Sequence, residues 1–232
     1  MGQDAYYPMF ADLNGRRCVV IGGGVVAQRK VTTLLGYGAV ITIVSPAVTK
    51  RLSAYARAGK VRHIARRFQP ADLRGAWLVY AATDDQAINQ QVFRAASAQR
   101  IFTNVVDQKP LCSFIAPAIA RRGPVTVAVS TGGASPSLAK QIRDEVEEII
   151  ENGYLPMARL LKSLRGVAKR ALPGYDDRKR YCDRLVRGGA FELVRRGRFG
   201  DARQAALRLL AQSNGRTLDA RKKEKGKRKK TT

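Results

Sequence analysis

Apolar and polar positions in the first half of the chain follow two alternating periods. Short β-branched runs alternate with stretches in which apolar residues recur every three or four positions, which predicts strands separated by helices. The expected strands are residues 17–21, 40–44, 61–65, 77–82 and 101–106, and the expected helices are residues 26–36 and 86–98. Because the strands are apolar almost throughout, the sheet should be parallel and covered on both faces. The pattern predicts an α/β fold with a Rossmann-like, doubly wound parallel sheet.

The pattern changes after residue 107. Residues 114–120 and 125–130 predict two strands joined by a turn, and residues 137–150 predict a helix with Ser135 as N-cap and Pro136 at its first position. From residue 155 the sequence is helical and basic, with breaks near residues 173–174, 188–189 and 197. We expect a Rossmann-like domain at 1–112, two strands plus a helix at 113–153, a basic helical domain at 154–215 and a disordered basic tail at 216–232.

A glycine-rich turn follows the first expected strand and opens the first helix. Residues 22–27, GGGVVA, match the G-x-G-x-x-A pattern in the strand-to-helix context that this pattern requires. Gly22 permits the tight turn, Gly24 lets the backbone approach a pyrophosphate, and the amides of Val25 and Val26 face the phosphates. The alternative is a glycine turn without a ligand. Because the turn lies directly between a strand and a helix, the sequence favours a bound dinucleotide.

The second strand ends in Ser45, Pro46 and Ala47, where a dinucleotide-binding fold usually places an acidic residue against the ribose. Ser45 lies 18 residues beyond Ala27. A serine hydroxyl can bind a ribose hydroxyl, but it does not exclude a 2′-phosphate as a carboxylate would. The sequence therefore favours NAD over NADP without excluding NADP.

Two further strands end in polar residues at the same carboxyl edge of the expected sheet. Thr83 and Asp84 follow the fourth strand, where they either contact a ligand or stabilise the next helix, and Asp85 is the better candidate for the helix cap. Asn104 to Asp107 end the fifth strand. Asp107 is placed to accept a proton while a hydride leaves for the cofactor. Its alternative role is to stabilise the turn that leads to Pro110.

A second glycine-rich turn, STGGASP at residues 130–136, also runs into a helix. Its exposed amides, including those of Gly132 and Gly133, and the positive end of the helix dipole could hold a substrate carboxylate. An ordinary strand-to-helix connection is the alternative.

The composition is that of a globular protein with a large excess of positive charge. Of 232 residues, 45% are hydrophobic, and the formal net charge is +25. Residues 216–232 contribute +7, which any polyanion attracts through counterion release, so the tail alone does not define a nucleic-acid-binding protein. The remaining +18 would raise the local concentration of an anionic substrate.

Several classes of protein are disfavoured. No apolar run approaches the roughly 20 residues of a membrane-spanning helix, and the first residues do not form a secretory signal. Cys18, Cys112 and Cys182 lie too far apart in the sequence for a CxxC pair or a zinc site, which favours a reducing, cytoplasmic location. The single histidine, His63, falls in a strand and is expected to be structural rather than catalytic or metal-binding.

Four segments together resemble the precorrin-2 dehydrogenase and sirohydrochlorin ferrochelatase family, which is the N-terminal module of siroheme synthase. They are YYPMFADLNGRRCVVIGGGVVAQRK, YAATDDQAINQQV, IFTNVVDQKPLCSFIAPA and VAVSTGGASPSLAKQIR, and they span most of residues 6–151. Past Tyr154 we identify no clear signature of the family. The chain is also too short for the methyltransferase domain that some siroheme synthases carry, so we expect a separate methylase upstream.

The resemblance implies NAD-dependent oxidation of precorrin-2 to sirohydrochlorin, with insertion of Fe²⁺, or of Co²⁺, in bifunctional members. It implies that Asp107 is the general base and that Ser130 lines the tetrapyrrole pocket, to which we add Asn104, Gly132 and Gly133. It also implies that Val25, Val26, Pro46 and Ala47 contact NAD. The family is homodimeric, with the two strands and helix after Asp107 forming much of the contact.

The carboxylate arms of precorrin-2 agree with the positive charge of the chain. Lys109, Arg121, Arg122 and Lys140 are candidate partners for these carboxylates, although a solvated basic surface is the alternative for each. A non-enzymatic NAD-sensing regulatory domain remains a rival interpretation, but such a domain has no need of Asp107 or of the STGGASP turn.

Overall fold

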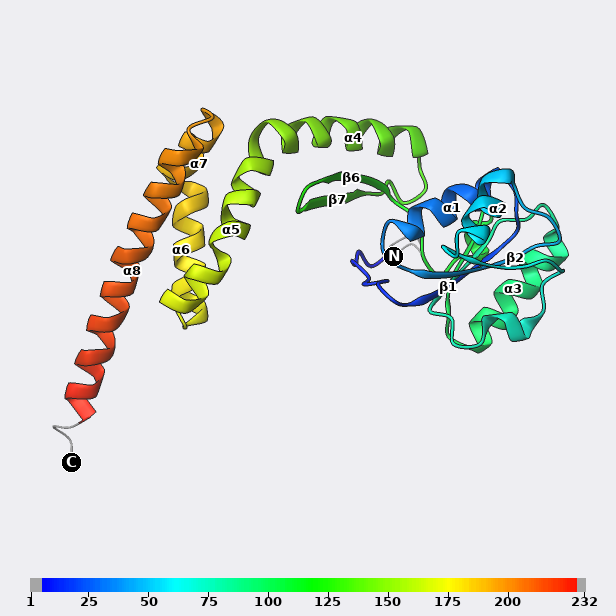
Figure 1. Ribbon diagram of the computed structural model, residues 1–232, viewed down its shortest axis with the longest axis horizontal. Coiled ribbons are helices and arrows are strands. Elements are labelled where there is room, and N and C mark those ends of the chain that lie inside the picture. The colour runs from blue at the N-terminus through cyan, green and yellow to red at the C-terminus, as the bar shows by residue number, and fades with distance from the viewer. Residues whose placement is uncertain (1–5, 229–232) are drawn as a thin grey trace. The chain divides into compact units, whose positions relative to one another are not determined.

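The computed structural model describes residues 6–228, without the side chains of residue 152 and residues 216–228. The chain divides into two compact units, residues 1–116 and 117–232. Figure 1 traces both units along the chain.

The first unit is built on a five-stranded parallel sheet in the order β3-β2-β1-β4-β5. The strands are β1 (Arg17–Ile21), β2 (Val40–Val44), β3 (Arg62–Ile64), β4 (Leu78–Ala81) and β5 (Phe102–Val105). The helices are α1 (Val25–Leu35), α2 (Lys50–Arg57) and α3 (Gln86–Ala98), with short 3₁₀ turns η1 (Pro70–Leu73) and η2 (Lys109–Leu111). The predicted α/β fold is confirmed.

Alternate residues of each strand pack on opposite faces of this sheet. Val20 and Ile43 share one core cluster with α1 and α2, whereas Val19 and Val79 share another with α3 and η1 (Figure 1). Because both faces are covered, successive strand residues are buried. This burial on both faces explains why the strands are apolar almost throughout in the sequence.

Side-chain caps fix where several helices begin. Asp85 Oδ1 accepts a hydrogen bond from Ile88 N at 3.1 Å, and Ser135 Oγ accepts one from Leu138 N at 3.1 Å, as the sequence predicted for both caps. Helix α2 was not predicted. It has eight residues, of which Leu52 is buried, and Thr49 caps it by accepting from Leu52 N at 3.2 Å.

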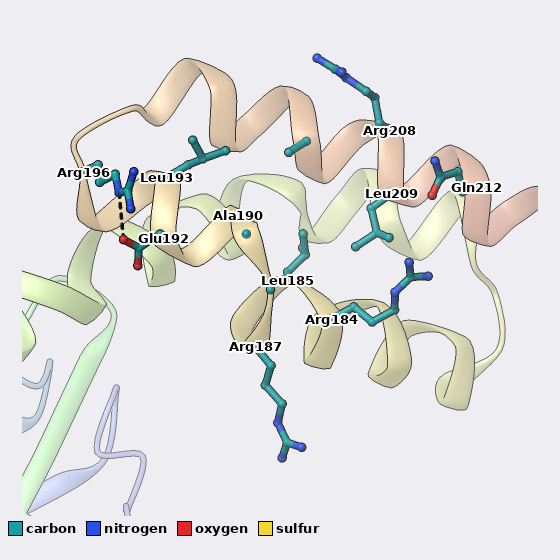
Figure 2. A pocket seen from close by; sticks show the side chains of 13 residues that line it. Arg184, Leu185, Arg187, Ala190, Glu192, Leu193, Arg196, Arg208, Leu209 and Gln212 are labelled. Carbon is teal, nitrogen blue, oxygen red and sulfur yellow. Dashed lines mark hydrogen bonds and ion pairs between the residues drawn. The ribbon is translucent and has the colours of Figure 1, made fainter.

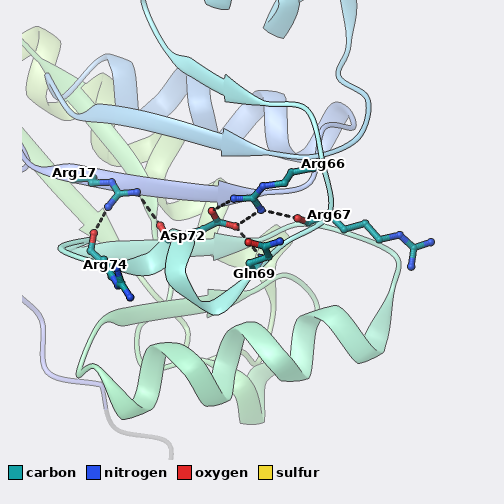
Figure 3. Close-up of polar contacts among 6 residues, drawn as sticks. All are labelled: Arg17, Arg66, Arg67, Gln69, Asp72 and Arg74. Atoms are coloured by element: carbon teal, nitrogen blue, oxygen red, sulfur yellow. Dashed lines mark hydrogen bonds and ion pairs between the residues drawn. The ribbon is translucent and has the colours of Figure 1, made fainter.

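A partly buried ion pair ties the segment after β3 to η1 (Figure 3). Arg66 binds Asp72 in a bidentate manner, with N–O distances of 2.9 and 2.6 Å, and Gln69 N donates to the same carboxylate at 2.8 Å. The Arg17 guanidinium donates to the backbone carbonyls of Asp72 and Arg74. The turn before β4 is therefore anchored to both β1 and the end of β3.

The second unit begins with an antiparallel hairpin of β6 (Ala118–Arg122) and β7 (Val125–Val129). Helix α4 (Pro136–Ile149) continues through a π-helical turn, η3 (Ile150–Tyr154), into α5 (Leu155–Ala171). Ala120 on the hairpin packs with Ile150 and Leu155 in a small core. The expected domain boundary near Gly153 therefore lies inside a continuous helical path.

A four-helix arrangement completes this unit. It consists of α5, α6 (Tyr175–Arg187), α7 (Gly189–Arg195) and α8 (Phe199–Arg228), whose core includes Leu164, Tyr181, Leu185 and Ala206. The breaks between these helices fall at the predicted positions. The tail expected to be disordered from residue 216 is helical as far as Arg228, and residues 229–232 lie outside the described part. Its many Lys and Arg residues have high helix propensity, which lets α8 continue beyond its packed portion.

Candidate active site

The glycine-rich loop lies where the strand order reverses, between β1 and β4. Gly22 has φ +115°, and a Cβ at this position would lie 2.1 Å from the carbonyl oxygen of Ala82 on the neighbouring strand. Gly22 N donates to Val44 O at 3.0 Å, so the loop is also joined to β2. Such a switch point is where doubly wound sheets bind their ligands.

Gly24 differs from Gly22 because its missing side chain faces open space. A Cβ on Gly24 would meet no atom within 4 Å, and no side chain caps the start of α1. Val25 is 66% exposed, and the first turn of α1 carries no acidic residue. The uncapped amides and the space in front of them fit a dinucleotide pyrophosphate, for which Gly24, Val25 and Val26 would supply the cradle.

The segment after β2 is held closely against this loop. A Cβ on Gly23 would lie 1.9 Å from Ala47 O and 2.9 Å from Ser45 Oγ. Ser45 Oγ donates to Ala47 O at 2.7 Å, and Pro46 and Ala47 are exposed. His63 Nε2 donates to Ser45 O at 2.9 Å, which gives His63 a structural contact at this edge of the sheet.

The end of β4 is stabilised mainly by its own polar groups. Thr83 Oγ1 accepts from Asp85 N at 3.2 Å, and Thr83 O accepts from Asn89 Nδ2 at 2.9 Å. Asp84 between them is exposed. Thr83 thus has a local structural role, whereas Asp84 faces solvent at the carboxyl edge.

Asp107 follows β5 in an unusual backbone conformation. Its φ is +60°, in the left-handed region that non-glycine residues rarely occupy and that Asp tolerates better than most. The neighbouring peptides are fixed, since Val106 N donates to Ala81 O at 2.9 Å and Gln108 N to Val105 O at 3.2 Å. The side chain is exposed at the same sheet edge as the glycine-rich loop. Left-handed backbone at such a position is characteristic of functional sites.

Lys30 is a residue near this carboxylate that the sequence analysis missed. Its Nζ lies 4.8 Å from the ring centroid of Tyr80. Burial is the largest cause that lowers the pKa of Lys30, and Arg29 lowers it further, while Asp107 and Cys112 act in the opposite direction. The available signal was a lysine at position 30 within the buried stripe of α1, between Ala27 and Val31.

Asn104 has a structural contact at the site. It is buried on β5, opposite Tyr80 in the sheet register, and its Nδ2 donates to Phe114 O at 3.0 Å. Phe114 in turn packs edge-on against Tyr80, with ring centroids 5.4 Å apart. Asn104 therefore holds the segment that follows Asp107 against the sheet.

The other predicted substrate residues belong to the second unit. Gly132 and Gly133 have φ values of +64° and +93°, and exposed Ser130 accepts from Gly132 N through its Oγ at 3.2 Å. Thr131 Oγ1 accepts from Ser135 N at 3.1 Å and donates to Ser135 O at 3.0 Å, which closes the loop in front of α4.

Arg122, a candidate carboxylate-binding cation, is engaged by carboxylates of the chain itself. Arg122 contacts Glu147 at 2.6 Å and Glu151 at 3.6 Å, so it ties β6 to the helical path of α4 and η3. Lys109, Arg121 and Lys140 are exposed.

A basic groove of about 850 Å³ lies among α6, α7 and α8 (Figure 2). Arg184, Arg187, Arg196 and Arg208 line it together with Leu185 and Leu209, and Arg196 Nε donates to Glu192 at 2.9 Å. None of the residues predicted from the sequence lines this groove.

Most of the predicted site residues lie at the carboxyl edge of the five-stranded sheet. These residues are Gly22, Gly24, Val25, Val26, Ser45, Pro46, Ala47, Thr83, Asp84, Asn104 and Asp107. An open glycine cradle and a carboxylate at one switch point define a dinucleotide-binding protein of the Rossmann type. Among the described residues, no helix has the length and hydropathy that crossing a membrane requires.

Comparisons with known proteins agree with this class of protein and narrow it to a family. Residues 9–118 match a family of NAD(P)-binding domains, residues 122–149 match the central region of sirohaem biosynthesis proteins, and residues 153–210 match the sirohaem synthase dimerisation region. The chain belongs to the siroheme synthase family. The third match corrects our expectation that no family pattern extends past Tyr154, because a helical bundle is encoded by a diffuse apolar pattern rather than a short motif.

Individual relatives give the same result. Siroheme synthase of Thioalkalivibrio sulfidiphilus is 40% identical over 205 residues, and that of Methylococcus capsulatus is 41% identical over 202 residues. These matches cover 88% and 87% of this chain but 42% and 43% of the relatives, so the chain spans less than half of their length. The solved structure of SirC, a precorrin-2 dehydrogenase, has a TM-score of 0.70 at 26% identity and covers 86% of this chain and 100% of its own.

Proposed function

We propose that this protein is an NAD-dependent dehydrogenase that oxidises precorrin-2 to sirohydrochlorin in siroheme biosynthesis. The observation that carries the proposal is the exposed Asp107 carboxylate at the same sheet edge as the open cradle of Gly24. The match to a precorrin-2 dehydrogenase over its whole length supports the choice of substrate. A homodimer is the proposed assembly, and the reducing cytoplasm is the proposed location.

The reaction removes two hydrogen atoms from the tetrapyrrole, that is, two protons and two electrons. NAD⁺, when bound, accepts one hydrogen with both electrons as a hydride, and Asp107 accepts the other as a proton. The amides of Val25 and Val26 and the α1 dipole would orient the pyrophosphate, while Lys30 adds positive charge close to Asp107. Asp107 then releases its proton to solvent, which restores the base.

Residues of the second unit are proposed to hold the carboxylate arms of the substrate. Ser130 and the amides around Gly132 and Gly133 offer donors at the start of α4, where the helix dipole favours an anion. Asn104 is proposed to contact the tetrapyrrole from β5. The positive charge of the chain would draw an octacarboxylate toward these groups.

Metal insertion is a separate prediction for the same protein. Among the described residues, no three His, Cys, Asp or Glu side chains gather as a metal-binding group. The nitrogens of sirohydrochlorin would therefore provide most of the ligands for Fe²⁺ or Co²⁺ during chelation. Each metal is added after oxidation is complete, and the absorption spectrum is compared with that of a control that has the metal but no protein. This order separates oxidation from metal insertion.

The main test follows NADH formation at 340 nm under anaerobic conditions with freshly prepared precorrin-2. Asp107→Asn should lower turnover by about 100-fold or more, because general-base catalysis contributes on the order of 10²–10⁴ in rate. The Kd for NADH should stay within about threefold of the wild-type value, since the residue is outside the pyrophosphate cradle.

Asp183→Asn is the matched control because it removes the same charge from an exposed position on α6. Near-normal turnover by Asp107→Asn would contradict the role of the base. NAD binding without any turnover by the wild-type protein would instead favour the rival NAD-sensing domain.

A further inference from the structure

Lys30 of α1 lies over the part of the sheet that leads to Asp107. It follows Val26 by one helical turn, and its Nζ is 4.8 Å from the centroid of the Tyr80 ring on β4. Tyr80 is paired with Asn104 of β5 in the parallel register, and residues paired in this way point to the same face of a sheet. Lys30 therefore lies on the same face as Asn104, which is already proposed to contact the tetrapyrrole.

Aromatic side chains form the surface of this face beside Lys30. Helix α1 packs against β1, β2 and β4, while α3 covers the opposite face, where Val79 and Val105 are buried. On the Lys30 side, Phe114 packs edge-on against Tyr80, with ring centroids 5.4 Å apart, and against Phe102, at 6.4 Å. Phe102 is 42% exposed. Within the described part of the first unit, an aromatic surface is thus open next to a lysine and close to the proposed base.

The Lys30 ammonium has no anionic partner in the part of the chain that the structure describes. None of the ion pairs there involves it. Burial lowers the pKa of Lys30, so the fold holds the charged form at a cost that the contact with the Tyr80 ring offsets only in part. A methionine would cover the same ring without this cost. Packing alone therefore does not explain an ammonium at this position.

The surroundings of Lys30 favour the substrate over the nucleotide as the source of the missing anion. The pyrophosphate belongs at the free amides that begin α1, whereas Lys30 lies a turn further along, over β4. The charges that raise its pKa belong to Asp107 and Cys112, which both follow β5. Cys112 is held there by donating from Sγ to Val105 O at 3.2 Å. The ammonium is therefore close to the base, where the reacting part of the tetrapyrrole has to lie.

We propose that Lys30 binds a carboxylate arm of the tetrapyrrole and so fixes the reacting ring beside Asp107. Because the rings of precorrin-2 carry carboxylate arms, the ring that loses its hydrogens brings an anion to the ammonium. The pair supplies the partner that Lys30 lacks and orients the ring toward the base. The proposal rests on the proposed function and adds a binding group from the first unit to the Ser130 loop of the second.

The test compares Lys30→Met with the wild-type protein at pH 8, where carboxyl groups are ionised. Methionine keeps the length of the side chain over Tyr80 and removes the charge. With saturating NAD under anaerobic conditions, the KM for precorrin-2 should rise by about tenfold or more, because a charged hydrogen bond to the substrate is lost. The kcat should stay within about threefold, as expected for an interaction made equally in the ground state and the transition state.

Binding measurements separate this role from a structural role. The Kd for sirohydrochlorin, titrated without nucleotide, should rise in parallel with the KM, whereas the Kd for NADH should stay within about threefold. Lys30→Met should unfold at the wild-type temperature or above it, because the variant removes a half-buried charge. Lys30→Arg should recover most of the substrate affinity, since a guanidinium also pairs with carboxylates.

Lys60→Met is the matched control. The Lys60 Nζ also lies over a tyrosine ring, 5.8 Å from the centroid of Tyr55, but this lysine is exposed just before β3, at the opposite edge of the sheet from Asp107. Its replacement removes the same charge and the same kind of ring contact. The KM for precorrin-2 and the Kd for sirohydrochlorin should both stay at the wild-type values.

Each contrary result has a distinct meaning. An unchanged KM and an unchanged Kd for sirohydrochlorin in Lys30→Met would overturn the proposal and leave the dehydrogenase intact. Weaker binding of NADH would assign the ammonium to the nucleotide, and a fall in kcat alone would assign it to the chemical step, so either result also overturns the proposal. Failure of the wild-type protein to oxidise precorrin-2 would instead overturn the proposed function.

Discussion

At the scale of single residues, the backbone of Asp107 decides how its chemistry should be tested. A left-handed φ of +60° costs an alanine about 1 kcal/mol, whereas Asp and Asn tolerate this region. Asp107→Ala would therefore combine loss of the base with loss of stability. Asp107→Asn keeps the backbone preference and isolates the loss of the proton acceptor, so it should unfold at the wild-type temperature while losing turnover.

The Arg66–Asp72 pair predicts how stability changes in acid. Burial raises the pKa of Asp72, but the Arg66 hydrogen bonds, the Gln69 amide and the charges of Arg66 and Arg17 outweigh it and hold the pKa below its ordinary value. A carboxyl group with a lowered pKa stabilises the fold above its unfolded-state pKa of about 4 and loses this contribution as pH falls through the folded-state value.

Asp72→Ala should therefore reduce the free energy of unfolding at pH 7 by about 2 kcal/mol, since it leaves the partly buried donors of Arg66 and Gln69 without their acceptor. Urea unfolding of the variant and the wild-type protein should converge as pH drops below about 4. A constant difference between them from pH 7 to pH 2.5 would show that Asp72 acts through packing instead of charge.

Residue-level prediction from the sequence succeeded where a local rule applies. The caps at Asp85 and Ser135 follow from their place before a helix, and His63 is structural, as predicted. Lys30 was missed because its relation to Asp107 depends on how α1 packs against the sheet, where Lys30 lies over Tyr80 of β4. Ser130 stays a prediction, because its role depends on a substrate that the chain alone does not place.

At the scale of elements, the glycine-rich loop separates a folding requirement from a binding requirement. Gly22 cannot take a side chain, since its φ is +115° and a Cβ would be 2.1 Å from Ala82 O, whereas Gly24 faces open space. Gly22→Ala should lower the free energy of unfolding by about 3 kcal/mol or prevent folding. Gly24→Ala should fold normally and weaken NADH by about tenfold or more, because the methyl group enters the pyrophosphate cradle.

Thermal unfolding and NADH titration of the two variants check this contrast. If Gly24→Ala unfolds at the same temperature as the wild-type protein, its binding defect is local to the cradle. Unchanged NADH affinity in Gly24→Ala would mean that the pyrophosphate does not lie at the start of α1, and it would remove the basis for the cradle.

Elements with a strong repeating pattern were predicted more completely than weak ones. The five strands and helices α1 and α3 follow from buried apolar positions, but α2 escaped prediction because Leu52 is its one fully buried residue and polar positions surround it. The charge of residues 216–232 suggested disorder, whereas α8 continues to Arg228, where helix propensity and continuity with a packed helix extend the element. The hairpin of β6 and β7 was recognisable from its turn residues.

At the scale of the whole molecule, α4 carries an apolar stripe that its own unit does not cover. Leu138, Ile142 and Ile149 are 48%, 36% and 57% exposed, and their spacings of four and seven residues place them on one face of the helix. A clustered apolar surface of this kind is typical of a protein interface. The match of the following residues to the sirohaem synthase dimerisation region supports a second copy of the chain as the partner.

We therefore expect light scattering after size-exclusion chromatography to give the mass of two chains for the wild-type protein. The double variant Leu138→Asp/Ile142→Asp should shift the mass toward one chain at micromolar concentration, because the interface would bury two carboxylates without partners. Ser137→Asp adds a charge beside the stripe at a position in the first turn of α4 that favours an acid, so it should remain dimeric. If the double variant keeps the dissociation constant of the wild-type dimer, the contact lies on another surface, and the exposed stripe of α4 has a different role.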